Sequence, residues 1–406
     1  MTPRPSSNTL YTNDNLYVLS GMNSESVDLI YLDPPFNSKR MYSASIGSKA
    51  AGASFKDMWT WQDVDEYYLD TLADQFPALA KYIASVGAVH SKPMMAYLTY
   101  MVQRLIEMHR VLKDTGSLYL HCDPTASHYL KSLLDAIFGK QNFINEIIWH
   151  YKNASRGKRR LAKAHDIIFW YGKSEHYQFG KDTILVPYES GMTQWRYSRG
   201  GQSGKEPPKG KIPDDVVLLP SLNSMDKKER TGYPTQKPLS LLRWIVNMAS
   251  MEGDTVMDPF CGCATTCVAA QQLQRKWIGI DIEKQAVNVL VQRLSDAGRL
   301  FRDFIATDQI PKRSDIKEVQ PSESIKQRLY KEQEGKCNAC GVDFELRNLE
   351  IDHIIPKAKG GGDYYENYQL LCGSCNRTKG DRPMEYLRLK IETRERMMKN
   401  KIFFGE

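Results

Sequence analysis

Apolar positions along the first 300 residues alternate between two spacings. Short runs rich in β-branched and aromatic residues predict strands over residues 27–33, 116–123, 145–151, 254–258 and 276–281. Apolar residues three and four positions apart predict helices over residues 94–113, 128–139, 239–251, 265–274 and 283–297. Strands and helices that alternate in this way build a mostly parallel sheet with helices on both faces. The pattern therefore predicts an α/β domain over residues 1–307.

Three segments depart from this alternation. Residues 37–93 are mixed and aromatic-rich, and we expect them to form a helical insertion. Residues 152–165 contain six Lys or Arg and no acidic residue. Residues 308–326 are polar and charged, which is typical of a linker. The linker separates the α/β domain from a compact, cysteine-containing domain over residues 327–406.

The bulk composition excludes few functions. Hydrophobic residues make up 41% of the 406 residues and charged residues 25%, as in ordinary globular proteins. The net charge of +7 permits a polyanionic partner without requiring one. No apolar run is long enough to cross a membrane, and the N-terminus carries no apolar signal segment. We therefore expect no membrane partner and a cytoplasmic location.

A small-residue turn follows the predicted strand at 254–258. Asp258 ends the strand, and Phe260, Gly262 and Thr265 lie between it and the next helix. Small residues let the backbone approach a nucleoside cofactor, and the helix N-terminus favours a negative group such as a carboxylate. Asp281 ends the following strand, where an acid can bind both ribose hydroxyls. Ala264 stands where this kind of turn usually has glycine, so we expect a slightly tightened site.

The tetrapeptide Asp33-Pro34-Pro35-Phe36 follows the predicted strand at 27–33. An exocyclic amino nitrogen of a base is a poor nucleophile because its lone pair is delocalised into the ring. A carboxylate and a proline-fixed carbonyl that accept hydrogen bonds from the amino group return electron density to the nitrogen. Two prolines hold the loop rigid, and an aromatic ring can stack on a base swung out of the duplex. The tetrapeptide taken alone is equally consistent with a strand-ending turn.

Together these motifs carry a resemblance. The stretches SVDLIYLDPPFNS, TGYPTQKPLSLL, VMDPFCGCATT and WIGIDIE resemble the DNA amino-methyltransferases in the permuted order called the beta group. The match covers roughly residues 8–300 and implies a Rossmann-like methyltransferase fold that uses S-adenosylmethionine and double-stranded DNA. An aspartate in the tetrapeptide resembles the adenine enzymes, whereas serine is more usual in the cytosine enzymes. The resemblance also suggests a homodimer.

The resemblance assigns roles to individual residues. Asp33, Pro34 and Phe36 would hold the target adenine, and Pro35 would stiffen the loop. Asp258, Phe260, Gly262 and Thr265 would line the cofactor pocket, and Asp281 would bind the ribose. Asp14 would contact the adenine of the cofactor, and Lys237 would lie near its methionine end.

DNA recognition is expected in the middle of the chain, over about residues 152–230. The basic stretch 152–165 would neutralise phosphates, and Trp195, Arg196 and Tyr197 would contact bases. A charge run is more often a solvated loop, but its position between the two halves of the methyltransferase favours DNA contact.

Two Cys-x-x-Cys pairs stand in the C-terminal domain. Cys337, Cys340, Cys372 and Cys375 have the spacing of a closed tetrahedral zinc site. The stretch IDHIIPKAKGGGDYYENYQLLCGSCNRTKGD between and after these pairs resembles the HNH endonucleases in their four-cysteine form, with a ββα fold. In that resemblance His353 would be the general base, and Asn367 would fix the loop that orients it. Asp352 and Asn376 would bind a catalytic Mg²⁺ ion through oxygen ligands.

The leading hypothesis is a restriction–modification-like protein, an adenine-specific DNA methyltransferase fused to an HNH nuclease. In one alternative the zinc domain only binds DNA and raises the affinity of the methyltransferase. In another the methylated base is cytosine.

Overall fold

The computed structural model describes residues 8–36, 40–44, 48, 50, 54–57, 72–73, 76–151, 159, 161–187, 210–222, 226, 229–296, 304–316, 318–382, 384, 386–388 and 390–391. Residues 152–158 and 160 of the basic stretch 152–165, the residues Trp195, Arg196 and Tyr197, and much of the rest of the expected recognition region lie outside these residues. So does much of the expected insertion at 37–93.

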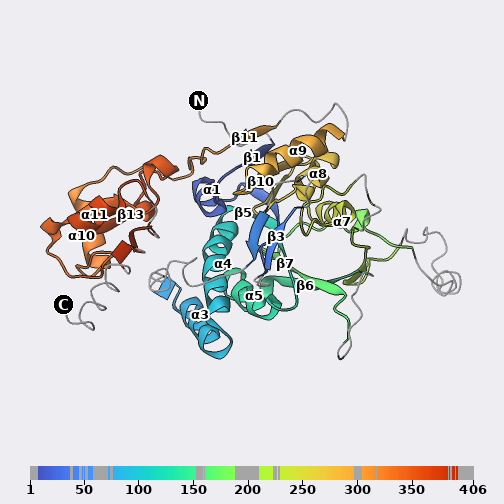
Figure 1. The fold of residues 1–406 in the computed structure, drawn as a ribbon, viewed down its shortest axis with the longest axis horizontal. Coiled ribbons are helices and arrows are strands. Elements are labelled where there is room, and N and C mark those ends of the chain that lie inside the picture. Colours follow the sequence, from blue (N-terminus) through green and yellow to red (C-terminus); the bar gives the residue numbers. More distant parts are fainter. Residues whose placement is uncertain are drawn as a thin grey trace.

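The larger domain is built on a nine-stranded sheet (Figure 1). Its strands are β1 (Thr9–Tyr11), β2 (Val27–Leu32), β5 (Leu112–Cys122), β6 (Phe143–His150), β7 (His165–Gly172), β8 (Val216–Leu218), β9 (Thr255–Asp258), β10 (Lys276–Ile280) and β11 (Ile305–Thr307). They lie in the order β11-β1-β10-β9-β2-β5-β7-β6-β8. Every pair is parallel except the two that β7 makes with β5 and β6. The mostly parallel sheet predicted from the sequence is therefore confirmed.

Helices cover both faces of this sheet. One face carries α1 (Asn15–Gly21), α3 (Pro77–Val89), α4 (Lys92–Val111), α5 (Ser127–Leu134) and the π-helical turn η2 (Asp135–Gly139). The other carries α7 (Leu239–Ala249), α8 (Thr265–Gln272) and α9 (Gln285–Asp296). Because neighbouring residues of a strand point to opposite faces, β2 buries Ile30 and Leu32 under the first set and Leu29 and Tyr31 under the second.

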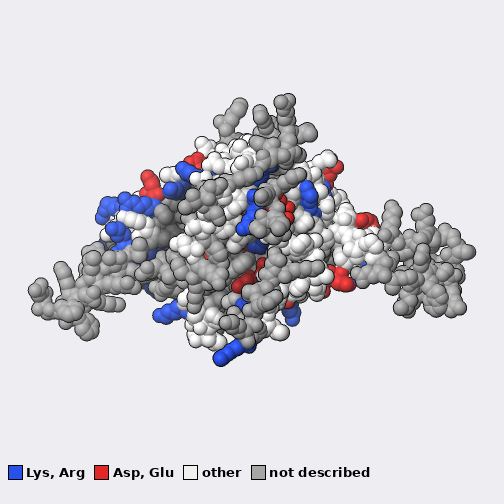
Figure 2. All heavy atoms as spheres, turned by 45° about the vertical axis from the view of Figure 1, so that its right-hand side comes forward, with Lys and Arg blue, Asp and Glu red and all other residues white. Residues whose placement is uncertain are grey.

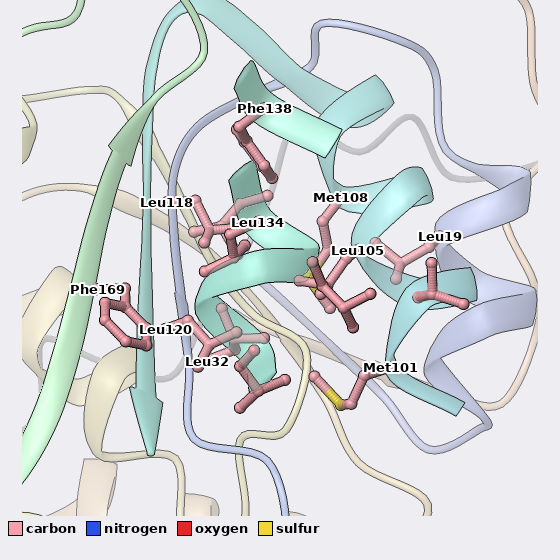
Figure 3. Packing of buried hydrophobic residues seen from close by; sticks show 14 of the residues in the cluster. Leu19, Leu32, Met101, Leu105, Met108, Leu118, Leu120, Leu134, Phe138 and Phe169 are labelled. Carbon is pink, nitrogen blue, oxygen red and sulfur yellow. The ribbon is translucent and has the colours of Figure 1, made fainter. Parts of the chain in front are cut away.

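The core beneath α4 shows how these layers form (Figure 3). Met101, Leu105 and Met108 recur at helical spacing along α4, are fully buried, and pack against Leu32 of β2 and Leu120 of β5. The helix begins cleanly because the side chain of its N-cap residue Ser91 accepts a hydrogen bond from the backbone N–H of Met94. This packing fixes β2 and β5 side by side and so determines where the loop after β2 emerges.

Several elements differ from the sequence-based prediction. Strands β1, β7, β8 and β11 of the sheet were not predicted, and β7 pairs with β5 and β6 in the antiparallel sense. The segment 37–93, predicted to be helical, contains a hairpin of β3 (Arg40–Ser43) and β4 (Ser54–Asp57) in addition to α3. Among the described residues no helix is long and apolar enough to cross a membrane.

The smaller domain has its own core. It contains α10 (Glu323–Glu332), the antiparallel pair β12 (Leu349–His353) and β13 (Tyr368–Cys372), and α11 (Gly373–Lys379), which is the predicted ββα arrangement. Helix α10 begins at Glu323 and buries Ile325 and Leu329 in this core. The predicted linker of 308–326 is therefore too long at its C-terminal end, since an amphipathic helix occupies its last residues.

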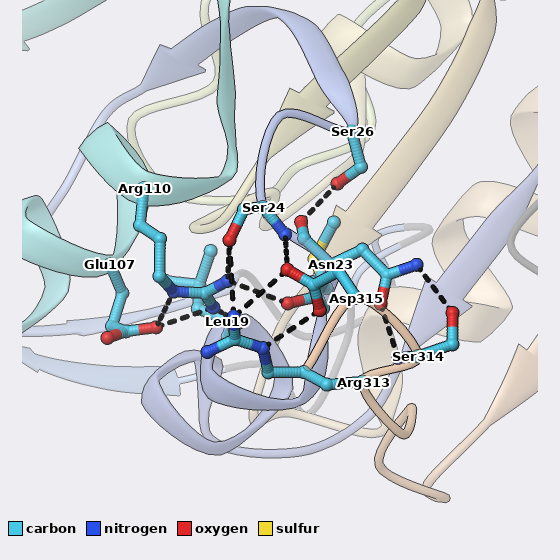
Figure 4. Close-up of polar contacts among 10 residues, drawn as sticks. Leu19, Asn23, Ser24, Ser26, Glu107, Arg110, Arg313, Ser314 and Asp315 are labelled. Carbon is cyan, nitrogen blue, oxygen red and sulfur yellow. Dashed lines mark hydrogen bonds and ion pairs between the residues drawn. The ribbon is translucent and has the colours of Figure 1, made fainter. Parts of the chain in front are cut away.

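The connecting segment is attached at both ends. On the larger domain, Asn23 accepts a hydrogen bond from the backbone of Ser314, and the backbone N–H of Ser24 donates to Asp315 over 2.9 Å (Figure 4). On the smaller domain, the backbone N–H of Val319 donates to the carbonyl of Asp363 over 2.7 Å. Polar contacts of this kind hold the two domains beside one another.

Candidate functional site

A cavity of about 480 Å³ lies where the carboxyl ends of β2 and β9 meet. These two strands are neighbours in the sheet. The strand that follows β9 in the chain, β10, lies on one side of this pair, and β5, which lies beside β2, is on the other. Open α/β sheets bind ligands where the strand order reverses in this way. All the residues that the sequence assigned to the catalytic loop and to the cofactor pocket line this cavity: Asp14, Asp33, Pro34, Pro35, Phe36, Lys237, Asp258, Phe260, Gly262, Thr265 and Asp281. The fold therefore brings together residues that lie far apart in the chain.

The turn after β9 is held by two carboxylates. Asp281 accepts hydrogen bonds from the backbone N–H groups of Gly262, over 2.7 Å, and Glu283, over 2.8 Å. Asp258 accepts from the backbone of Phe260 and from the hydroxyl of Thr266. Burial raises the pKa of Asp258 to about 7 and that of Asp281 to about 6. Both acids therefore titrate close to neutral pH.

Two residues of this turn adopt left-handed backbone conformations. Gly262 has φ of 51° and Ala264 has φ of 56°. At Gly262 an added Cβ would lie 3.0 Å from the ring of Tyr233, so the turn and this ring approach closely. Ala264 accepts the strained conformation that glycine would adopt at lower cost. Its φ value is the structural counterpart of the departure noted in the sequence.

Asp14 and Thr265 have structural partners at the cavity wall. Asp14 caps α1 by accepting from the backbone of Leu16, and it forms an ion pair with Arg104 over 2.9 Å. Thr265 accepts a hydrogen bond from Arg293 over 2.8 Å, and the same guanidinium nitrogen donates to the carbonyl of Cys263. Both polar side chains therefore have protein partners at the cavity wall.

The carboxylate after β2 is asymmetrically engaged. Lys237 donates to Asp33 Oδ2 over 2.5 Å. The other oxygen, Oδ1, is buried and has no hydrogen-bond partner among the residues that the structure describes. Lys237 also places its ammonium 5.3 Å from the centre of the Phe36 ring. The sequence placed Lys237 near the methionine end of a cofactor, and the structure places it directly on Asp33.

Four sulfur atoms cluster in the smaller domain. The Sγ atoms of Cys337, Cys340, Cys372 and Cys375 lie within 4.8 Å of one another. Zn–S bonds of about 2.3 Å in a tetrahedron separate the sulfurs by about 3.8 Å, so the cluster fits a structural zinc ion. The backbone N–H of Cys372 donates to Cys337 Sγ over 3.2 Å, which favours a thiolate there. The zinc ligand set predicted from the sequence therefore forms one cluster.

His353 ends β12 with its ring held by an acid. Its Nε2 lies 2.8 Å from Oδ1 of Asp363, and Tyr368 donates to the same oxygen over 3.1 Å. Hydrogen bonds from Lys357 and then from His353 hold the pKa of Asp363 well below its usual range. Asn367 bonds to the N–H and the carbonyl of Ile355, which closes the loop after His353. Asp363 was not identified from the sequence. It directly follows the three glycines at 360–362 and stands four residues before Asn367.

The two residues expected to bind Mg²⁺ lie at the contact between β12 and α11. Asp352 forms an ion pair with the buried Lys379 over 2.9 Å and accepts from Gln369. Asn376 donates to Glu350 over 2.5 Å. In the structure, the side chains of Asp352 and Asn376 therefore bond to different protein partners.

Comparison with known proteins agrees with both halves of this description. The family model described as DNA methylase matches residues 27–292, which is more than half of the chain. The model described as HNH endonuclease matches residues 337–382. The chain belongs to the DNA methylase family. Its C-terminal domain is an HNH domain.

Several relatives of this DNA methylase are similar over long stretches. The type II methyltransferase M.EcaI of Enterobacter cloacae is 30% identical over 52% of this chain, which spans 60% of that relative. The DNA adenine methyltransferase YhdJ of Escherichia coli K12 is 26% identical, over 77% of this chain and 93% of its own length. Among solved structures, the PvuII DNA methyltransferase, described as cytosine-N4-specific, has 16% identity over 74% of this chain and 95% of its own, with a TM-score of 0.44.

Three residues in or behind the wall of this cavity were not identified from the sequence. Arg104 forms an ion pair with Asp14, Arg293 donates to the carbonyl of Cys263 in the turn after β9, and the ring of Tyr233 lies against Gly262. Arg104 stands on the buried face of α4, where a charged residue in an apolar stripe signals a partner. Charged side chains are also visible on the surface: basic and acidic groups of described residues lie among uncharged ones on the face drawn in Figure 2.

Proposed function

We propose that this DNA methylase transfers a methyl group from S-adenosylmethionine to the exocyclic N6 of adenine in double-stranded DNA. One observation carries the proposal: Asp33 Oδ1 is a buried hydrogen-bond acceptor with no partner among the described residues, in the wall of the cavity that also holds the cofactor turn. A buried acceptor without a partner is costly, and the amino group of a flipped base satisfies it.

The cofactor turn fits the proposed cofactor. Gly262 and Asp281 both line the cavity. Asp281 accepts two backbone N–H groups and has further lone pairs for ribose hydroxyls. When bound, S-adenosylmethionine supplies an electrophilic methyl group on a sulfonium sulfur. N6 would take this methyl group, the sulfur would keep the electron pair of the broken carbon–sulfur bond, and the proton that the amino nitrogen loses would pass to the solvent.

The residues of the loop after β2 prepare the nitrogen for this reaction. Asp33 Oδ1 and the carbonyl of Pro34 accept hydrogen bonds from the amino group, which localises the lone pair on N6. Phe36 stacks on the flipped base and offsets part of the cost of extrusion, which is a few kcal/mol. Lys237 holds the second oxygen of Asp33, so that the carboxylate presents Oδ1 to the base.

Adenine is the preferred target because Asp33 begins the tetrapeptide and because YhdJ is described as a DNA adenine methyltransferase. Unmethylated plasmid DNA incubated with the protein and S-adenosylmethionine, then digested to nucleosides, tests the base. N6-methyladenine supports the proposal. Detection of N4-methylcytosine instead would show that cytosine is the target base. Unmodified DNA would overturn the proposed methyltransferase activity.

We further propose that the HNH domain cleaves DNA. His353, oriented by Asp363, would take a proton from the attacking water. Asp352 and Asn376 would contribute oxygen ligands to Mg²⁺, which would stabilise the leaving oxygen. At Asp352 the metal would compete with the Lys379 ammonium, because both neutralise the same carboxylate.

Plasmid cleavage in the presence of Mg²⁺ tests this second activity. Wild-type protein should produce fragments, and His353→Ala should leave the plasmid intact while methylating it normally. Equal behaviour of the two proteins, with no fragments from either, would favour the alternative in which the HNH domain only binds DNA.

A further inference from the structure

A chain of hydrogen bonds, buried at Tyr31 and His121 and partly exposed at Asp166 and Tyr151, lies behind the Phe36 ring. The hydroxyl of Tyr31 lies 2.8 Å from Nδ1 of His121, and Nε2 of His121 lies 3.1 Å from Oδ2 of Asp166. Tyr151 completes the chain by donating to Oδ1 of Asp166 over 3.2 Å. Tyr31 lies on β2, His121 on β5 and Asp166 on β7, and Tyr151 directly follows β6. These strands are consecutive in the sheet, so the hydrogen-bond chain runs across it.

The environment determines which group donates at each step. An ionised carboxylate can only accept, so Nε2 of His121 carries a proton and donates to Asp166. In the neutral ring Nδ1 is then the acceptor for the hydroxyl of Tyr31, whose pKa burial raises well above its usual range. Burial alone would raise the pKa of Asp166, but hydrogen bonds from His121 and Tyr151, with neighbouring charges, hold it below its ordinary value. Both ring nitrogens of His121 are therefore satisfied, and the ring has one orientation.

This fixed ring faces the catalytic loop. His121 has no exposed surface, and its ring stacks on Phe36 with the centroids 6.1 Å apart and the planes 25° from parallel. Trp149 meets His121 edge-on at 5.5 Å. Tyr31, which anchors Nδ1, also lines the cavity and stands two residues before Asp33. The polar groups of Tyr31 and His121 would be costly to bury without partners, and both have them here.

We propose that Tyr31, His121 and Asp166 are positioning residues for methyl transfer: they fix the plane of the Phe36 ring, and through it the target base. The inference rests on the proposed function, because it assigns Phe36 to the flipped base. The three residues touch neither base nor cofactor in this assignment. Misplacement of a reacting group by about 1 Å costs about a hundredfold in rate, so loss of the network should reduce turnover.

Tyr31→Phe tests the proposal with a matched control. The substitution removes only the hydroxyl that anchors Nδ1 of His121. Tyr119 is the direct cross-strand neighbour of Tyr31, is equally buried, and has a hydroxyl without a hydrogen-bond partner among the described residues. With plasmid DNA and labelled S-adenosylmethionine, Tyr31→Phe should lower kcat about tenfold or more and leave the KM for S-adenosylmethionine unchanged. Tyr119→Phe should behave as wild type.

A double-mutant cycle separates positioning from a general loss of stability. If His121 acts through Phe36, then Tyr31→Phe should have little further effect on kcat in a Phe36→Leu background. Independent, multiplicative losses overturn the inference, as does wild-type kcat in Tyr31→Phe. Absence of methylation by the wild-type protein overturns the proposed function, and the inference with it, whereas a normal wild type with an unaffected Tyr31→Phe overturns the inference alone.

Discussion

Lys237 and Asp33, which are 204 positions apart in the chain, form an ion pair with Nζ 2.5 Å from Oδ2. The pair divides the carboxylate between a protein partner and the cavity. Both side chains are largely buried, with 9% of Lys237 and 18% of Asp33 exposed. An ion pair in such a place has a strong orienting effect, because neither charge can turn to water without leaving the other unpaired.

Lys237→Met should reduce methyl transfer by about a hundredfold. The substitution keeps much of the side-chain volume and leaves a buried carboxylate without its cation, which costs about 3–5 kcal/mol when the pair is fully buried. Without Lys237, neither oxygen of Asp33 is held by a cation, so the carboxylate no longer presents Oδ1 to the base in one orientation. Steady-state methylation of plasmid DNA measures the change.

The matched control for this variant is Lys113→Met. Lys113 forms an ion pair of 2.7 Å with Asp28, which lies on the same strand as the residues leading to Asp33 but at its other end. That pair is partly exposed and lies away from the cavity lining, so its loss should change the rate less than twofold. Equal losses in both variants would show that Lys237 acts only through stability.

S-adenosylmethionine binding should strengthen as pH rises from 5 to 8. Burial raises the pKa of Asp281 to about 6 and of Asp258 to about 7, both above the ordinary value. Acids with raised folded-state pKa values stabilise the ligand-free protein at low pH, and this contribution is lost as pH rises through those values. The ligand needs the ionised carboxylate of Asp281 as an acceptor, so the increase in Tm that it causes should grow over the same window.

Thermal unfolding with and without S-adenosylmethionine, at several pH values, measures this effect. Asp281→Asn removes one titrating group and should flatten the dependence between pH 5 and 7. An increment in Tm that is constant across pH in the wild type would contradict the assignment of Asp281 to the ribose.

The residues expected at the site lie together in the fold, whereas several strands of the sheet were not predicted. Asp33 follows β2 and Asp258 ends β9, and acids at the carboxyl ends of parallel strands meet when those strands are neighbours, as β2 and β9 are. Strands β1 and β11 have three residues each, too few for a periodic pattern. Strand β7 carries the apolar run IIFWY, which is typical of a strand. Because basic residues precede it, the segment was instead included in the expected recognition region of 152–230.

Pairings across long distances escaped prediction for a physical reason. Lys237 meets Asp33 because the loop before α7 folds over the carboxyl end of β2, and no local propensity encodes that approach. The chain from Tyr31 to Asp166 depends on the antiparallel register that sets His121 opposite Ile168 and Asp166 opposite Trp149. Side-chain chemistry is readable from a sequence, whereas partners set by strand register require the fold.

Removal of zinc should disable the HNH domain and spare the methyltransferase. The four cysteines hold β13 and α11 against the turn at 337–340, and the small core around Leu349 and Leu370 is separate from the cores of the larger domain. Metal analysis should find one zinc ion per chain. After chelation, proteolysis should begin between residues 323 and 382, while methylation of plasmid DNA continues, because methyl transfer needs no metal.

Cys372→Ser should reproduce the effect of the chelator without removing other metals. Cys122→Ser is the control, since Cys122 is a buried cysteine of β5 outside the cluster. Loss of methylation in parallel with loss of zinc would contradict the independence of the two cores.

Asp363→Asn should slow DNA cleavage by about tenfold or more and leave methylation unchanged. The carboxylate accepts from Nε2 of His353 over 2.8 Å and is itself held by Lys357 and Tyr368, so it fixes both the orientation and the tautomer of the ring. Asparagine retains the shape but loses the charge that favours the protonated imidazole formed when His353 takes a proton from water.

Glu345→Gln provides the control, because Glu345 forms an exposed ion pair with Arg347 in the same domain. Plasmid nicking with Mg²⁺, followed over time for both variants and for His353→Ala, measures the rates. Cleavage by Asp363→Asn at the wild-type rate, with His353→Ala inactive, would show that His353 acts without this acid, whereas equal cleavage by all the variants would place the nuclease activity elsewhere.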